Sequence, residues 1–145
     1  MNGDALARAC ADAMWAEDRA SRGLGMALVE VAQGRAVVAM QITEAMVNGH
    51  GLCHGGFIFT LADSAFAFAC NTYDQRTVAQ HCAVTFIRSG KLGERLVATA
   101  VERSRSGRSG IYDVTVARED GSVIAEFRGN SRTIDGTLLA AKTEE

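Results

Sequence analysis

The sequence predicts an α+β domain in which an antiparallel sheet of five to six strands wraps around one central helix. Three observations lead to this fold class. Residues 55–71 form a long apolar run rich in Ala, Leu and Phe, which is typical of a buried helix. Segments with strand composition precede and follow the run, and turn residues separate them. Since such a sheet must bury one face, a single helix can fill its concave side.

One helix and two strands are predicted before the central run. Residues 4–20 contain good helix formers, and Asp4 is the candidate N-cap. Residues 26–42 predict two short strands joined by a turn at Gln33 and Gly34.

Four strands are predicted after the central run, at residues 78–88, 96–104, 111–119 and 122–134. The third alternates cleanly between polar and apolar residues, and its apolar face carries Tyr112, Val114 and Val116. Asp120 and Gly121 predict the hairpin turn before the last strand.

The composition fits one globular domain over residues 1–145, with 48% hydrophobic and 22% charged residues. A net charge of −2 argues against nucleic-acid binding, which usually needs a basic excess. No segment offers the roughly 20 apolar residues of a membrane span, and the N-terminal segment lacks the apolar core of a signal peptide. We expect a cytoplasmic protein with reduced cysteines and a flexible tail at residues 136–145.

One acid, Asp63, lies in the middle of the apolar run. Leaving an ionised carboxylate unpaired in an apolar interior costs several kcal/mol. One interpretation is a narrow polar stripe, because Thr60, Asp63 and Ser64 share one helix face. The other is a catalytic carboxylate that faces a cleft.

The start of the helix favours the catalytic interpretation. His54, Gly55 and Gly56 follow a loop at residues 43–54 that is rich in Gly, His and Asn. The first N–H groups of a helix have no internal partners and carry partial positive charge, and glycine lets a ligand approach the backbone. Such a site polarises a carbonyl oxygen. A tight junction between loop and helix is the simpler alternative for this glycine pair.

The spacing of Gly55 and Asp63 predicts a site shared between two subunits. Eight residues of one helix separate the two groups by about 12 Å. Two antiparallel copies of the helix, related by a two-fold axis, can combine Gly55 of one subunit with Asp63 of the other.

Residues 48–71 read NGHGLCHGGFIFTLADSAFAFACN. This stretch resembles the signature of the hotdog-fold acyl-CoA thioesterases of the phenylacetate-degradation (PaaI) type, and the similarity covers roughly residues 5–137. The resemblance implies a hotdog fold, homodimers that assemble into homotetramers, and hydrolysis of phenylacetyl- or hydroxyphenylacetyl-CoA without a cofactor or metal. An apolar or aromatic acyl pocket also fits the positions of Phe57, Phe66 and Phe68.

The resemblance implies roles for individual residues. Asp63 is the acid that activates water or attacks the thioester, and the Gly55 N–H polarises the carbonyl. His54 supports that turn, Asn48 helps to orient water or substrate, and Gly56 belongs to the substrate site.

The sequence departs from the family pattern in two places. Ser89 stands where a proline is common, which loosens a turn. Gln80 and His81 occupy the strand where some members place a Ser or Thr near the acid, so both are candidates for substrate binding or assistance.

A basic turn at Arg103, Arg105 and Arg108 is the candidate seat for the phosphates of coenzyme A, to which Arg88 and Lys91 could contribute. A solvated hairpin is the commoner explanation of such a turn.

Other functions fit less well. The histidines and nearby cysteines resemble a metal set, but their spacing matches no standard zinc pattern: His50, Cys53, His54, His81 and Cys82. A Cys53–His54 nucleophile pair is disfavoured because sequence neighbours rarely point at each other. A non-catalytic acyl-CoA sensor is the alternative function, and Asp63 together with the His54–Gly55 turn argues against it. A hotdog dehydratase would need a His and Glu pair in the helix region, which this sequence lacks.

Overall fold

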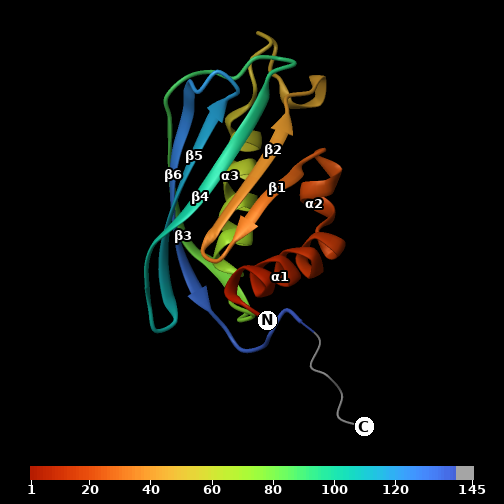
Figure 1. The fold of residues 1–145 in the computed structure, drawn as a ribbon. Helices are drawn as coiled ribbons and strands as arrows, with labels where there is room; N and C mark the ends of the chain where they lie inside the picture. Colours follow the sequence, from red (N-terminus) through yellow and green to blue (C-terminus); the bar gives the residue numbers. More distant parts are fainter. Residues whose placement is uncertain (140–145) are drawn as a thin grey trace.

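The computed structural model describes residues 1–139, and their fold confirms the predicted class (Figure 1). The helices are α1 (Gly3–Glu17), α2 (Arg19–Gly23), η1 (Glu44–Met46, a 3-10 turn) and α3 (Gly55–Cys70). The strands are β1 (Ala27–Ala32), β2 (Arg35–Gln41), β3 (Thr77–Phe86), β4 (Arg95–Ser106), β5 (Ser109–Arg118) and β6 (Val123–Thr133). All six form one antiparallel sheet in the order β1-β2-β4-β5-β6-β3.

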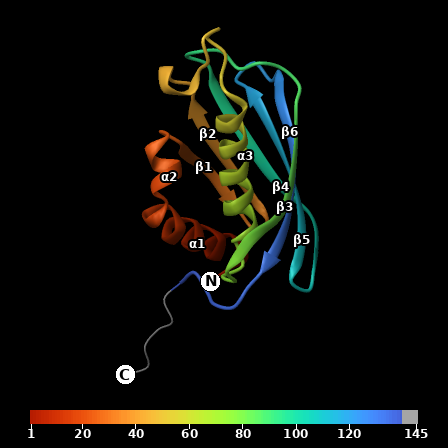
Figure 2. The ribbon, with the colours of Figure 1, turned by 180° about the vertical axis from the view of Figure 1, so that it is seen from behind.

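The helix α3 lies along the concave face of the sheet, as the apolar run predicts (Figure 2). The side chains of Leu61, Ala65 and Phe66 are fully or almost fully buried there. They pack in one core with the inward residues of β5, which include Val114 and Val116. Burial on most sides explains why the segment is apolar almost all round.

The predicted helix at residues 4–20 is wrong in two respects. The cap of α1 is Asn2, whose side chain accepts a backbone N–H of the first turn at 2.7 Å. Asp4 instead accepts the N–H of Gln33 in the β1–β2 turn at 3.0 Å. The helix also stops at Asp18, because this carboxylate caps the separate helix α2.

The strand β3 forms one end of the sheet, so only its side toward β6 is paired within the described residues. A bulge interrupts this pairing at Gln80. Exposed apolar side chains lie along the strand and just after it, at Val78, Phe86 and Ile87. An open edge of this kind is a surface on which another strand can pair.

The chain continues past β6, where the N–H groups of Leu138 and Leu139 both donate to Asp74 at 2.9 Å. The rest of the tail that we expect to be flexible, residues 140–145, lies outside the described residues.

Candidate active site

The first turn of α3 presents a free hydrogen-bond donor at the protein surface. His54 is the N-cap, and its Nδ1 accepts the N–H of Gly56 at 3.1 Å. The carbonyl of His54 accepts the N–H of Phe57 at 3.0 Å. No residue among 1–139 accepts the N–H of Gly55. The positive end of the helix therefore offers this N–H to an external oxygen.

Asp63 lies two turns further along α3 and is partly buried. Burial raises the pKa of its carboxyl. Within the described residues, none of the hydrogen bonds or ion pairs involves this carboxylate. Burial and then the charge of Asp63 raise the pKa of the Cys82 thiol, which places β3 close to the acid. An acid with a raised pKa and no internal partner is a candidate general base.

The polar stripe considered for α3 does not include Ser64. The Ser64 hydroxyl is buried and hydrogen bonds with the Ser21 hydroxyl of α2 at 2.8 Å. Thr60 satisfies its own hydroxyl by donating to the carbonyl of Gly56 at 2.8 Å. Thr60 and Asp63 both stay partly exposed, so only Ser64 falls outside the expected stripe.

Asn48 holds the loop that precedes α3. Its Oδ1 accepts the N–H groups of His50 at 2.9 Å and Leu52 at 3.2 Å. The same loop is fixed to the start of the helix, because the N–H of His54 donates to the carbonyl of Met46 at 2.8 Å. The Asn48 oxygen is thus engaged in the loop, and its amide nitrogen is the group left for water or substrate.

Two surface pockets flank the first turn of α3. The pocket on the β3 side, of ≈ 320 Å³, is lined by Cys53, Gly55, Ile58, Phe86, Ile87, Arg88 and Ser89. The pocket on the α2 side, of ≈ 230 Å³, is lined by Gly23, Leu24, Gly25, Thr43, Ala45, Met46 and Phe57. A larger hollow of ≈ 490 Å³ includes neither Gly55 nor Asp63 and is lined largely by charged residues, among them Glu94 and Arg118.

Of the three phenylalanines expected at an acyl pocket, only Phe57 lines one of these pockets. Phe66 packs in the core, with its ring 5.7 Å from Tyr112 and 5.8 Å from Phe127. Phe68 is equally buried. The expectation for Phe66 and Phe68 is wrong because both face the sheet or α1 rather than the surface.

Gln80 and His81 lie on the exposed edge strand β3. The bulge leaves Gln80 without a partner in register on β6, whereas His81 pairs with Asn130. The sequence suggests Cys82 only as a metal ligand. In the structure, Cys82 is the β3 residue whose thiol pKa is raised by burial and then by the charge of Asp63. Within residues 1–139 no three His, Cys, Asp or Glu side chains come together to hold a metal.

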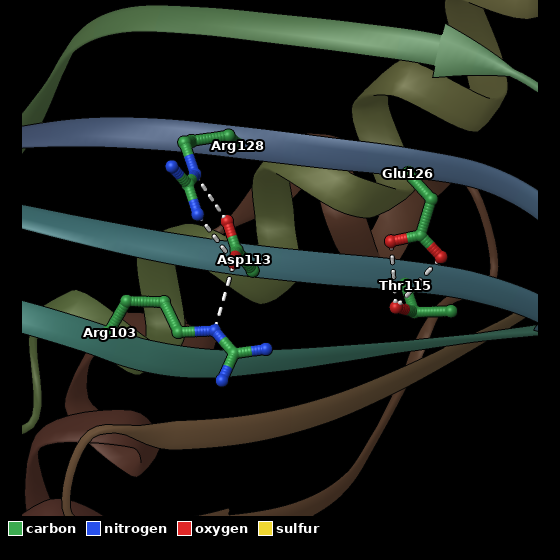
Figure 3. Close-up of polar contacts among 5 residues, drawn as sticks. All are labelled: Arg103, Asp113, Thr115, Glu126 and Arg128. Carbon is green, nitrogen blue, oxygen red and sulfur yellow. Dashed lines mark hydrogen bonds and ion pairs between the residues drawn. The ribbon is translucent and has the colours of Figure 1, made fainter.

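Each arginine of the basic turn has a partner within the chain. Arg103 donates to Asp113 at 2.9 Å, and Arg128 binds the same carboxylate from the next strand (Figure 3). The hydrogen bonds from Arg128 and Arg103 lower the pKa of the Asp113 carboxyl, and the contribution of Arg128 is the larger. These three side chains lie on the convex face of the sheet, away from α3.

The other two arginines of the turn lie at the end of the sheet opposite Gly55. The Arg105 guanidinium lies 3.6 Å from the centre of the Tyr73 ring, and Arg108 is 4.0 Å from Asp135. Lys91, near the start of β4, pairs with the loop before α3, whereas Arg105 lies at the other end of that strand. Ten residues of extended chain correspond to about 33 Å. Gly55 and Arg105 of one protomer therefore lie near opposite ends of the sheet.

Comparison with known proteins places this chain in a family. Residues 50–125 match the thioesterase superfamily. The chain is 41% identical over 128 residues to the acyl-coenzyme A thioesterase PaaI of Escherichia coli, covering 88% of this chain and 91% of that protein. A putative esterase of Deinococcus radiodurans is 44% identical over 73% of each chain.

Solved structures give the same result. The fold is similar to that of the E. coli PaaI protein from the phenylacetic acid degradation operon, with a TM-score of 0.92 and 40% identity over 94% of this chain and 99% of that one. It is also similar to a mutant of the phenylacetic acid degradation protein PaaI from Thermus thermophilus, with a TM-score of 0.78 and 38% identity over 81% of this chain and all of the other. Among the described residues, no helix is long and apolar enough to cross a membrane.

Proposed function

Because the chain belongs to the thioesterase superfamily as an acyl-CoA thioesterase of the PaaI type, we propose that it hydrolyses aryl-acyl-CoA of the phenylacetyl or hydroxyphenylacetyl class. The single observation that carries the mechanism is that one helix holds both the Gly55 N–H and the partly buried Asp63 carboxylate, and that neither has a partner among residues 1–139. The products are the free acid and coenzyme A.

The chemistry requires two groups at one thioester. The Gly55 N–H donates to the carbonyl oxygen and stabilises the negative charge that develops on it. Ionised Asp63 takes a proton from water as the water attacks the carbonyl carbon, or itself attacks to form a mixed anhydride that water then opens. In both routes the C–S bond breaks, and coenzyme A leaves as the thiolate.

We propose that the two groups come from different subunits of a homodimer. They lie about 12 Å apart on one continuous helix. The uncovered stripe of α3, which includes Gly56, Thr60, Asp63 and Ala67, lies beside the open edge of β3. Antiparallel contact of two such helices around Phe59 would bring Gly55 of each opposite Asp63 of the other. Association of two dimers into a homotetramer completes this proposal, and the four free thiols suit a reducing compartment such as the cytoplasm.

The raised pKa of Asp63 predicts the pH dependence of the reaction. The carboxylate must be ionised to accept a proton, so activity is lost as the pH falls through the folded-state pKa. Because burial raises that pKa, we expect the acidic limb of kcat/KM to lie above the ordinary pKa of an aspartate, 3.8. A pH–rate profile with phenylacetyl-CoA measures this limb. A rate that stays constant down to about pH 4 would contradict the role of Asp63, provided that circular dichroism shows the fold intact there.

We expect the basic turn to contribute to the binding of coenzyme A thioesters and therefore to lower their KM. In the proposed dimer, Arg105 and Arg108 lie beyond Asp63, on the side to which coenzyme A bound at the partner subunit's Gly55 can extend. Since hydrogen bonds to charged groups contribute about 1.5–3 kcal/mol, Arg105→Gln or Arg108→Gln should raise KM for phenylacetyl-CoA about tenfold or more. Arg103→Gln should change this KM less, because Arg103 lies on the convex face and is paired with Asp113.

A truncated thioester without the nucleotide serves as the control substrate, because phosphate contacts are remote from the reacting carbon. Arg8→Gln on α1, which also removes an exposed ion-pair partner, is the matched control variant. Equal changes in KM for both substrates would show that the basic turn is a solvated hairpin with no role in binding coenzyme A.

A further inference from the structure

The pocket on the α2 side of α3 has the composition of a site for an uncharged apolar group. Two of its walls come from the segment Gly23, Leu24 and Gly25 and from the segment around η1, and Phe57 of α3 forms the third. Thr43 supplies its one polar side chain, and none of the lining residues is ionisable. An acyl group with a free carboxylate would find no cation there, and its desolvation would be uncompensated.

The size of this pocket fits one aromatic ring. Its volume is ≈ 230 Å³. An apolar cavity of about 150 Å³ is sufficient to bind benzene in a protein interior. The additional space corresponds to a short linker between a ring and a carbonyl carbon.

The pocket on the α2 side lies next to the first turn of α3, which holds the proposed catalytic Gly55. Phe57 stands two residues after Gly55 in the first turn of α3, and its ring is 6.4 Å from the His54 ring. Met46, whose side chain is buried in the opposite wall, accepts the N–H of His54 through its carbonyl at 2.8 Å. The walls are thereby held against the residue that caps the helix.

We infer that this pocket binds the acyl group of the thioester, and that Gly23 and Ala45 on its two walls set the size of the acyl group that is accepted. The inference rests on the proposed function, because Gly55 in the same turn holds the thioester carbonyl. The competing acyl site is the pocket on the β3 side, which is lined by Gly55 itself but carries Arg88 and Ser89 and is the more polar of the two.

Leucine substitutions that fill the pocket test this assignment. A Cβ added at Gly23 would meet no atom within 4 Å, and the backbone conformation of Gly23 is an ordinary one for L-residues. Ala45 is exposed on the opposite wall. Because one methylene in a hydrophobic pocket changes discrimination by about tenfold or more, we expect Gly23→Leu and Ala45→Leu each to lower the kcat/KM ratio of phenylacetyl-CoA to acetyl-CoA at least about tenfold.

Ala16→Leu, which adds the same side chain to an exposed helical residue outside the pocket, should leave that ratio unchanged. Thermal unfolding of all three variants checks that each is folded. Unchanged ratios in both pocket variants would overturn the assignment and favour the β3-side pocket.

A binding measurement separates this inference from the proposed function. In an Asp63→Asn background, titration with phenylacetyl-CoA reports acyl recognition without turnover. Gly23→Leu in that background should weaken phenylacetyl-CoA binding about tenfold relative to acetyl-CoA. If the wild type hydrolyses no thioester but this loss of binding occurs, the proposed function fails while the pocket stands. If hydrolysis occurs and the two ligands weaken equally, the pocket assignment fails.

Discussion

Asp63→Asn is expected to lower kcat for acyl-CoA hydrolysis at least about 10²-fold, the usual scale for the loss of a general base. The amide is nearly the same size as the carboxylate, so it leaves the packing of α3 in place but cannot accept a proton from water. Release of free coenzyme A, followed with a thiol reagent, measures the loss. Asp12→Asn on the exposed side of α1 is the matched control, because it makes the same chemical change far from the helix start.

The stability of the same variant distinguishes a catalytic loss from a folding defect. Burial raises the folded-state pKa of Asp63 above its unfolded value. A group of this kind favours the folded state below the unfolded pKa, and this contribution is lost as the pH rises through the folded pKa. At neutral pH the wild type therefore carries the cost of a half-buried charge, and Asp63→Asn should have an equal or higher Tm. The difference should disappear in acid. Hydrolysis by Asp63→Asn at the wild-type rate would rule out the catalytic role of this residue.

The sequence predicts the central part of the fold because its signals there are long and mutually consistent. The apolar run at residues 55–71 can only be a buried helix, and the alternation around Tyr112 places one face of β5 in the core. The N-terminal helix is harder to predict because Asn2 and Asp4 are equally good caps in sequence. The choice between them depends on a contact with Gln33, which lies 29 residues away from Asp4.

Parts of the site are also visible in the sequence. A charge within an apolar helix and glycines at its start identify Asp63 and Gly55 by residue type alone. Three arginines close together in sequence predict one basic cluster, yet strand pairing directs Arg103 to Asp113 on the convex face. The pocket beside Phe57 has no sequence motif, because its other walls are brought to α3 only by the folding of the β1–β2 hairpin.

Subunit complementation tests most directly whether each active site is shared between two subunits. Gly55→Pro removes the proposed carbonyl-binding N–H, and proline is tolerated at the first position of a helix. His54 already has the extended backbone, with φ −62° and ψ 134°, that precedes proline. Gly55→Ala is the matched control, because it adds a Cβ near the exposed Phe86 ring but keeps the N–H.

The decisive measurement is the thioesterase activity of purified heterodimers that pair a Gly55→Pro subunit with an Asp63→Ala subunit, each carrying a different affinity tag. Both parental homodimers should be almost inactive, since every site in them carries one lesion. A heterodimer contains one site with intact Gly55 and intact Asp63, and one site with both lesions. We therefore predict about half of wild-type activity for the purified heterodimer, and about a quarter for a randomly paired mixture. Heterodimers that are as inactive as their parents would show that both groups act from one chain and would contradict the shared site.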